Sequence, residues 1–447
     1  MSRHSLCLLP SLAYFLFAPP SQPQSQAASS STTYAITGGK VFTLAGDAID
    51  NGTLLIRDGK ILAVGANISA PAGAQVIDAK GLQVYPGLFD AVTQIGLREI
   101  ASVSGTVDTT ETGLFNPDVV AAEAVLPSSE HIPVTRAAGI TEVLTVPASG
   151  GFDSGSSQSV LGGQASAIHL AGWSISDMLI KKNVAMALSW PRIETEVFDM
   201  TTFSRRSKPY KEAKEEYDKQ VSELTDWIDR ARHYALAMGH GGPADYQRDL
   251  KLEALVPVTR GELPVLVIAD RAREIRAAVD FCDKQKLKMI LAGGLEAYKV
   301  KDLLRSKSIP VILRPVLTLP LQEDDPYDRV LSQPAELKSA GLKIAFATFD
   351  NSFARRLGQQ AANAVAHGLP YDAALKAVTV EPAQILGLAD QVGTLETGKI
   401  ANVIVTTGDP LELTTDVRYL FIKGRLTSTD NKHKALYEKY ANRPKPQ

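Results

Sequence analysis

The sequence predicts an α/β fold: a (β/α)8 TIM-like barrel together with a small composite β-sandwich domain built from both chain ends. Through the long middle of the chain, apolar strand-like runs alternate with helical patterns at a spacing of roughly 20 to 25 residues, which is typical of parallel α/β folds. Short strands separated by turn residues occupy both ends, so we expect the ends to pair in one sheet domain. The length of 447 residues allows one large barrel with a smaller module.

The N-terminal residues have the pattern of an export signal. A basic start precedes an apolar run at 6–18, and small residues at 25–27 offer a cleavage site. The apolar run is short and contains Pro10, which makes a transmembrane helix a poor interpretation. We therefore expect residues 1–28 to be a signal peptide, the mature protein to be periplasmic or extracellular, and no membrane insertion after signal removal.

The composite β-domain is assigned to residues 33–85 and 395–427. Its N-terminal part contains Asp58-Gly59, a dipeptide typical of two-residue hairpin turns. Its C-terminal part has the same strand-like character, which is why we expect one domain from both ends. The strand-like runs are 34–44, 51–64, 398–405 and 417–424.

The barrel is assigned to residues 86–394, and one of its eight strands is poorly marked. The segment 271–287 is an amphipathic helix between two strand-like runs. An open doubly wound sheet is the alternative, but such a fold usually places a glycine-rich nucleotide-binding turn after a strand, and the sequence contains none. The predicted strands lie at 85–91, 140–146, 185–190, 264–269, 288–292, 309–313 and 343–347.

A charged helical insertion is expected at about residues 208–240. Pro209 suits the first turn of a helix, and the lysine and glutamate residues that follow can pair at i,i+3 and i,i+4 spacing. This pattern indicates a solvated helix on a loop of the barrel.

The composition limits the classes of partner. Hydrophobic residues make up 45% of the chain and charged residues 21%, as in a globular protein with a full core. The net charge of -2 and the lack of a basic face argue against nucleic acid. We expect a small-molecule ligand or substrate, and the sequence leaves a homo-oligomer open.

Three segments, in order along the chain, resemble the amidohydrolase superfamily. They are residues 56–65, the Pro-Gly-Leu-Phe-Asp-Ala segment at 86–91, and the run 374–405 with Gly408-Asp-Pro410. The last is similar to the C-terminal signature of the imidazolonepropionase-like and prolidase-like branch. The resemblance implies a metallohydrolase barrel that acts on carbon–nitrogen bonds other than peptide bonds, with cyclic amides or dipeptides as substrates and its site at the C-terminal mouth of the strands.

The metal ligands that this resemblance implies are missing from the chain. The first strand of the superfamily carries two metal-binding histidines, and Val92 and Gln94 stand at those positions. The histidine of strand five falls near Ile268, and that of strand six at Ala292 or Gly293. Valine, isoleucine and alanine offer no donor atom, and an amide oxygen is a weak, neutral ligand.

The strand-eight aspartate and the strand-four lysine of the superfamily also depart from its pattern. Asp350 stands one residue late, and no lysine occurs in the expected strand. Without these ligands a metal-activated water has no evident source. We therefore assign no metal ligand and expect no cofactor; Zn or another divalent metal is expected only if other residues have rebuilt a site.

Polar side chains near the predicted mouth are the candidate site residues, because ligand contacts concentrate at the ends of barrel strands. The Gly- and Ser-rich stretch 149–164 is also expected there. Glu296 follows strand six and suits either an acid–base role or the first turn of a helix. We predict catalytic roles for Asp350 and Glu296, and ligand contacts from Gln94, Gln164, His169 and Asp270.

Three hypotheses follow for the function. The first is an exported, degenerate and metal-free ligand-binding homologue of the amidohydrolases. The alternative is an active hydrolase with a rebuilt or metal-independent site, and the second alternative is a structural or assembly protein. Metal content and ligand binding separate the three.

Overall fold

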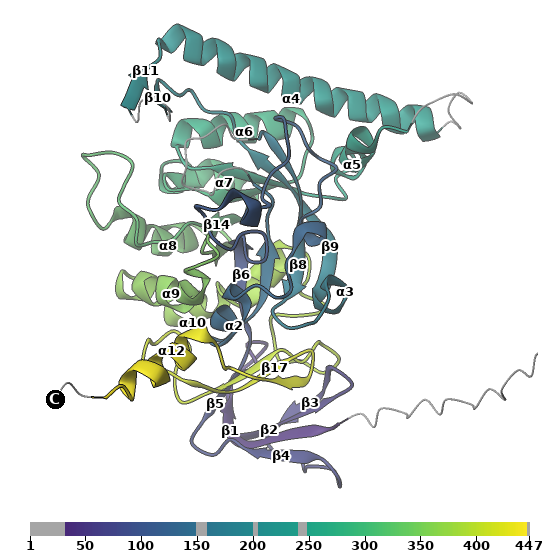
Figure 1. Ribbon diagram of the computed structural model, residues 1–447, viewed down its shortest axis with the longest axis vertical. Helices are drawn as coiled ribbons and strands as arrows, with labels where there is room; N and C mark the ends of the chain where they lie inside the picture. Colours follow the sequence, from purple (N-terminus) through teal and green to yellow (C-terminus); the bar gives the residue numbers. More distant parts are fainter. Residues whose placement is uncertain (1–31, 149–158, 200–203, 240–247, 445–447) are drawn as a thin grey trace, which may run out of the picture.

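The computed structural model describes residues 32–148, 159–199, 204–239 and 248–444. It consists of a barrel-like sheet with surrounding helices and a smaller sheet domain at one end of it (Figure 1). The expected signal peptide at 1–28 lies outside the described residues, as does most of the Gly- and Ser-rich stretch.

The smaller domain is one eight-stranded sheet made by both chain ends, in the order β18-β17-β16-β5-β1-β2-β3, with β4 paired to β1. The ends meet where β16 pairs antiparallel with β5, from Val403 opposite Pro86 to Thr406 opposite Gln83. The composite β-domain of the predicted fold is therefore confirmed. Its strands are Tyr34–Val41 (β1), Ile49–Arg57 (β2), Lys60–Gly65 (β3), Gln75–Asp78 (β4), Gln83–Pro86 (β5), Val403–Thr406 (β16), Val417–Ile422 (β17) and Arg425–Thr427 (β18).

The larger sheet is the predicted barrel, with the strand order β15-β14-β13-β12-β9-β8-β7-β6. The first and last strands meet just beyond β15, where the Phe349 N–H donates to the Val92 carbonyl at 2.9 Å. The side chain of Asp90 accepts from the Thr348 N–H and hydroxyl across the same seam. The strands are Leu88–Thr93 (β6), Ile140–Thr145 (β7), Leu161–His169 (β8), Leu179–Ser189 (β9), Val265–Ala269 (β12), Met289–Gly293 (β13), Val311–Leu313 (β14) and Ile344–Phe346 (β15).

One barrel strand departs from the parallel (β/α)8 pattern. β8 runs antiparallel to both of its neighbours, with Glu142 opposite His169 and Leu161 opposite Leu188. Antiparallel neighbours need no crossover helix, and only the short α3 (Ile175–Met178) separates β8 from β9. This is the poorly marked strand of the sequence, whose start falls in the stretch expected to be a mouth loop.

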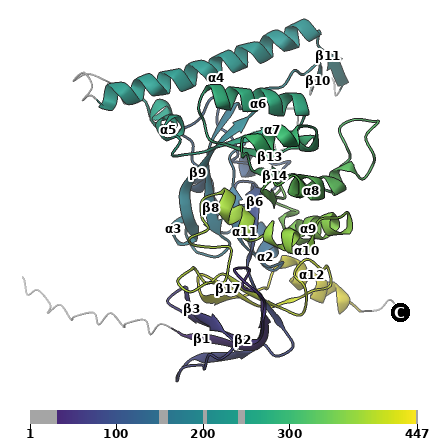
Figure 2. The ribbon, with the colours of Figure 1, turned by 180° about the vertical axis from the view of Figure 1, so that it is seen from behind.

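Helices α6 to α10 follow one another along one side of the barrel (Figure 1, Figure 2). The predicted amphipathic helix is α6, and it buries Ile275, Ala278, Val279 and Cys282. Near the barrel lie α1 (Ala121–Ala124), α2 (His131–Arg136), α5 (Leu250–Thr259), α6 (Ala272–Lys284), α7 (Lys301–Ser306), α8 (Arg329–Ser339), α9 (Leu357–Ala366), α10 (Tyr371–Lys376), α11 (Val380–Ile385) and α12 (Lys432–Ala441), with short 3-10 turns at Ser104–Thr106, Ala297–Val300 and Ala354–Arg356.

A 30-residue helix, α4 (Tyr210–Gly239), occupies most of the segment expected to be an insertion. It lies across the end of the molecule farthest from the β-domain, and a two-stranded ribbon of β10 (Glu196–Asp199) and β11 (Ser204–Ser207) lies beside its N-terminal end (Figure 2). Leu224, Ile228 and Ala231 are buried on its inner face, and its exposed face carries i,i+4 ion pairs such as that of Lys214 with Asp218. Within the described ranges, no helix combines the length and apolarity needed to cross a membrane.

Candidate functional site

A cavity of about 400 Å³ lies at the mouth of the barrel, beside the C-terminal ends of β12, β14 and β15. This end of a parallel barrel is where side chains from several strands converge on one space. Phe349, Leu295 and Pro315 give the cavity an apolar part. Its polar lining comes from Asp270, Arg314, Thr318, Thr348, Asp350, Arg356 and Gln360.

The deepest charged group of the cavity is an ion pair between Asp270 and Arg314. The Arg314 Nε lies 2.9 and 3.0 Å from the two carboxylate oxygens of Asp270, and both residues are only 8% exposed. The guanidinium of Arg192 approaches the same carboxylate at 3.7 Å, and that of Arg314 stacks over the Phe349 ring at 4.9 Å from its centroid. Two cations thus compensate one buried carboxylate. An unpaired charge at this depth would be strongly destabilising.

The backbone beside Asp270 is fitted to that carboxylate. Gly293, at the end of β13, has φ +106, and a Cβ built there would lie 2.6 Å from an Asp270 oxygen. A larger residue at 293 would therefore displace the carboxylate from Arg314. The ion pair of Asp270 with Arg314 thus explains why glycine stands at position 293, one of the two positions where the resemblance implies the metal ligand of strand six.

Asp350 lines the cavity from the turn after β15. Its Oδ1 accepts hydrogen bonds from the N–H groups of Ser352 and Phe353, at 2.5 and 3.2 Å. Its backbone carbonyl accepts from the Thr93 hydroxyl at 2.5 Å. Asp270, predicted to contact a ligand, and Asp350, predicted to be catalytic, therefore line the same cavity.

The barrel interior below this cavity is apolar at the positions where the resemblance implies metal ligands. Val92, Ile268 and Ala292 belong to one buried cluster that fills the interior. Gln94 is 1% exposed; its amide N–H donates to the Ala148 carbonyl at 3.1 Å, and its Oε1 is buried without a hydrogen-bond donor.

This donor set does not fit the metal centre of the superfamily. Such a centre needs three or four nitrogen, oxygen or sulfur ligands around one point. Of the residues at the expected ligand positions, Gln94 carries an amide oxygen, whereas Val92, Ile268 and Ala292 carry no donor atom. In the part of the chain that the structure describes, no three His, Cys, Asp or Glu residues are grouped so that they could hold a metal ion.

Glu296, predicted to be catalytic, lies beside the mouth but not on the cavity lining. Its carboxylate accepts from the Ala272 N–H at the start of α6 at 2.7 Å, and from Lys299 and Gln322 at 2.9 and 3.0 Å. Burial acts to raise the pKa of Glu296, but these hydrogen bonds hold the pKa below its usual range. A carboxylate held in this way serves as a helix cap.

Gln164 lies in β8 and does not line the cavity. Its side-chain amide donates to the Pro117 carbonyl at 3.1 Å, and its N–H donates to Val119 at 2.7 Å. Gln164 therefore fastens the 115–120 segment to the barrel wall. This arrangement gives the side chain a packing partner inside the protein.

His169 was expected near the mouth, and that expectation is wrong. Because β8 runs antiparallel, His169 lies at the opposite end of the barrel, level with the start of β7. Its Nδ1 accepts from the side-chain amide of Asn402 at 3.0 Å, and the same amide donates to Glu142 at 2.5 Å. Burial lowers the pKa of His169 to about 3, with the Lys423 charge adding to the effect. His169 is thus a neutral residue that joins the barrel to the β-domain.

Five of the polar residues that line the cavity were not predicted from the sequence: Arg314, Thr318, Thr348, Arg356 and Gln360. Arg314 directly follows the strand predicted at 309–313, so the rule that ligand contacts follow barrel strands would have selected it. Arg356 and Gln360 lie beyond the turn after β15, and no local pattern in the sequence marks them.

The comparisons with known proteins agree with this architecture. Residues 328–427 match the model of the amidohydrolase family. The crystal structure of an amidohydrolase from Thermotoga maritima superposes with a TM-score of 0.75 at 26% identity, covering 88% of this chain and 99% of that one. The C-terminal segment and the fold of the chain are those of the amidohydrolase superfamily. A prolidase complexed with N-methylphosphonate-L-proline shares the fold, with a TM-score of 0.53 at 16% identity over 89% of this chain and 99% of its own.

One curated relative of this chain is the amidohydrolase tasK of Hapsidospora irregularis. The two are 26% identical over 388 residues, which cover 80% of this chain. The match spans only 38% of tasK, so most of that protein lies outside it. These relatives are hydrolases by name.

Proposed function

We propose that this chain is a degenerate amidohydrolase-superfamily barrel that binds a small ligand at its mouth without a metal ion. The observation that carries the proposal is the apolar interior, where Val92, Ile268 and Ala292 stand at the positions that hold metal ligands in the superfamily. A metal ion would have to give up its water ligands there for side chains with no donor atom. Binding therefore rests on the cavity residues themselves.

The charges of the cavity favour an anionic ligand such as a small carboxylate. The carboxylate of Asp270 is compensated by Arg314 and Arg192, and that of Asp350 accepts two backbone N–H groups. Arg356, at the rim, forms no ion pair among the residues that the structure describes, and its guanidinium stacks 4.6 Å from the Phe353 ring centroid. A planar guanidinium in this setting suits a carboxylate, which it can bind through two hydrogen bonds.

The proposal is tested by ligand-induced thermal stabilisation with a panel of small carboxylates from acetate to benzoate. Arg356→Gln should weaken the affinity for the carboxylate that binds best by about tenfold, because a charge-assisted contact is lost. Arg355→Gln is the matched control, since Arg355 also stacks on Phe353 but does not line the cavity. Equal loss in both variants, or equal binding in all three proteins, contradicts Arg356 as the anchor.

The place of action is part of the proposal. An export signal at residues 1–28 would deliver the barrel to the periplasm or the medium, where small carboxylates from outside the cell are met first. N-terminal sequencing of the protein recovered from the cell envelope tests this point. A mature chain that begins within the first few residues would contradict export by a cleaved signal.

A further inference from the structure

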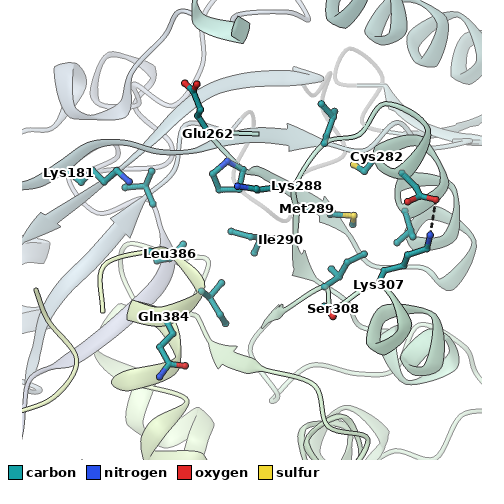
Figure 3. A pocket seen from close by; sticks show the side chains of 18 residues that line it. Lys181, Glu262, Cys282, Lys288, Met289, Ile290, Lys307, Ser308, Gln384 and Leu386 are labelled. Atoms are coloured by element: carbon teal, nitrogen blue, oxygen red, sulfur yellow. Dashed lines mark hydrogen bonds and ion pairs between the residues drawn. The ribbon is translucent and has the colours of Figure 1, made fainter. Parts of the chain in front are cut away.

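A second pocket, of about 580 Å³, lies at the opposite end of the barrel from the mouth (Figure 3). It is bordered by the starts of β9, β12 and β13, the end of α6, and the segment at the end of α11. Its volume falls within the range of about 300–1,000 Å³ that small-molecule sites occupy. No residue of the mouth cavity contributes to its lining.

The floor of this pocket is apolar. Val279 and Cys282 of α6 face Met289 and Ile290 of β13, with Leu386 beside them, and each of these five is less than 10% exposed. Burial raises the pKa of the Cys282 thiol to about 12, so at neutral pH the thiol is uncharged and belongs to the apolar surface. The floor suits a hydrocarbon chain better than a polar ligand.

The rim of the pocket is positively charged. Lys181 and Glu262 lie on one side and Lys307 on the other, with Met289 and Ile290 between them (Figure 3). The Lys307 amino group is paired with Asp283 at 2.8 Å. Lys181 and Lys288 form no ion pair among the described residues, which leaves two lysines against the single carboxylate of Glu262.

We propose that this pocket binds an amphipathic anion, with its hydrocarbon chain on the apolar floor and its carboxylate head between Lys181 and Lys288. Apolar burial provides most of the affinity in such a site, and the two lysines select the charge of the head group. The proposal is independent of the function of the mouth, because the two cavities share no residue.

Decanoate is the test ligand, with decan-1-ol as its neutral counterpart. Isothermal titration of the full mature chain should show decanoate binding at least about fivefold more tightly than decan-1-ol. The double variant Lys181→Gln, Lys288→Gln should lose about fivefold in decanoate affinity, the whole of this preference, and should no longer distinguish the two ligands. The matched control is Lys284→Gln with Lys376→Gln, two exposed lysines outside the pocket.

A second readout locates the ligand. The methyl group of Met289 lies at the floor, so decanoate should shift its NMR signal in ¹³C-methyl-methionine protein, with the signal assigned by Met289→Leu. Arg356→Gln, at the mouth, should leave this shift unchanged. Three results would overturn the proposal. They are an unmoved Met289 signal, equal binding of decanoate and decan-1-ol, and equal decanoate affinities of the pocket variant and the control variant.

Discussion

At the scale of single residues, the Pro-Gly-Leu-Phe-Asp-Ala segment at 86–91 has a structural role that does not involve a metal. Gly87 passes so close to β7 that a Cβ there would lie 1.7 Å from the Thr141 hydroxyl oxygen. Asp90 is fully buried and holds β6 to the segment after β15 through two hydrogen bonds from Thr348, and it accepts a third from Val92 within β6. Gly87 thus allows β6 to pack closely against β7, and Asp90 closes the barrel, so both residues have structural roles beside Val92 and Gln94.

Gly87→Ala should therefore destabilise the protein by roughly 1–3 kcal/mol or more, because an added methyl group cannot be placed without moving β7. Gly46→Ala is the control, since a Cβ there meets nothing within 4 Å. It should change the free energy of unfolding by less than about 0.5 kcal/mol. Chemical denaturation of both variants measures the difference. Similar free energies of unfolding for the two variants would contradict the close approach of Gly87 to Thr141.

Glu142 gives the protein a pH dependence that has a definite sign. Burial raises its pKa to about 8, against 4.5 for the ordinary side chain, although hydrogen bonds from Thr141 and Asn402 act the other way. A raised pKa in the folded state means that the contribution to stability is complete below pH 4.5 and is lost as the pH rises to 8. His169 has the opposite sign, because its depressed pKa costs stability only as the pH falls below 6.5 toward 3.

The window from pH 6.5 to 8 thus separates Glu142 from His169. Across it, the free energy of unfolding of the wild type should fall relative to that of Glu142→Gln, which keeps the shape of the protonated side chain. Asp90, whose burial raises its pKa to about 7, titrates in both proteins and cancels in the comparison. Parallel stability curves for the two proteins would show that Glu142 does not titrate in this range.

At the scale of elements, the turn after β15 explains why Asp350 stands one residue late. Phe349 has φ 54, in the left-handed region that side chains other than glycine rarely adopt, and its ring packs with Val92 and Ala347 inside the barrel. The extra residue is accommodated by this turn, and the chain then carries Asp350 to the cavity. The aromatic ring therefore occupies interior space close to the positions expected for metal ligands.

Phe349→Gly should be more stable than Phe349→Ala by about 1 kcal/mol, because both lose the ring but only glycine relieves the left-handed backbone. This order is the reverse of that in ordinary strand or helix positions. Denaturation midpoints at equal m-values measure it. An alanine variant as stable as the glycine variant would place the strain elsewhere.

The elements that sequence reasoning located well are those with strong periodic patterns. The helix at 271–287 and the strands before and after it were predicted because their apolar spacing is regular. The direction of β8 was not predictable, since its run of small residues fits a loop, a parallel strand or an antiparallel strand equally well. That single reversal moved His169 from the expected mouth to the other end of the barrel.

At the scale of the whole molecule, the fold class followed from the pattern of the chain, whereas the site followed only in part. The pairing of β5 with β16 joins the two ends as expected. Asp270 and Asp350 border one cavity, but the partners that set their charge state, Arg314 and the N–H groups of Ser352 and Phe353, come from pairings in space. A mouth of paired charges above an apolar interior is the basis of the proposed metal-independent binding.

Elemental analysis of the mature protein tests this claim most directly. The protein would be purified without chelator or a metal-binding tag, then incubated with Zn and Mn and freed of unbound ions. We expect far less than one metal ion per chain, together with unchanged thermal stability, because Val92, Ile268 and Ala292 supply no ligand. About one tightly held ion per chain would contradict it, and would favour an active hydrolase with a rebuilt site.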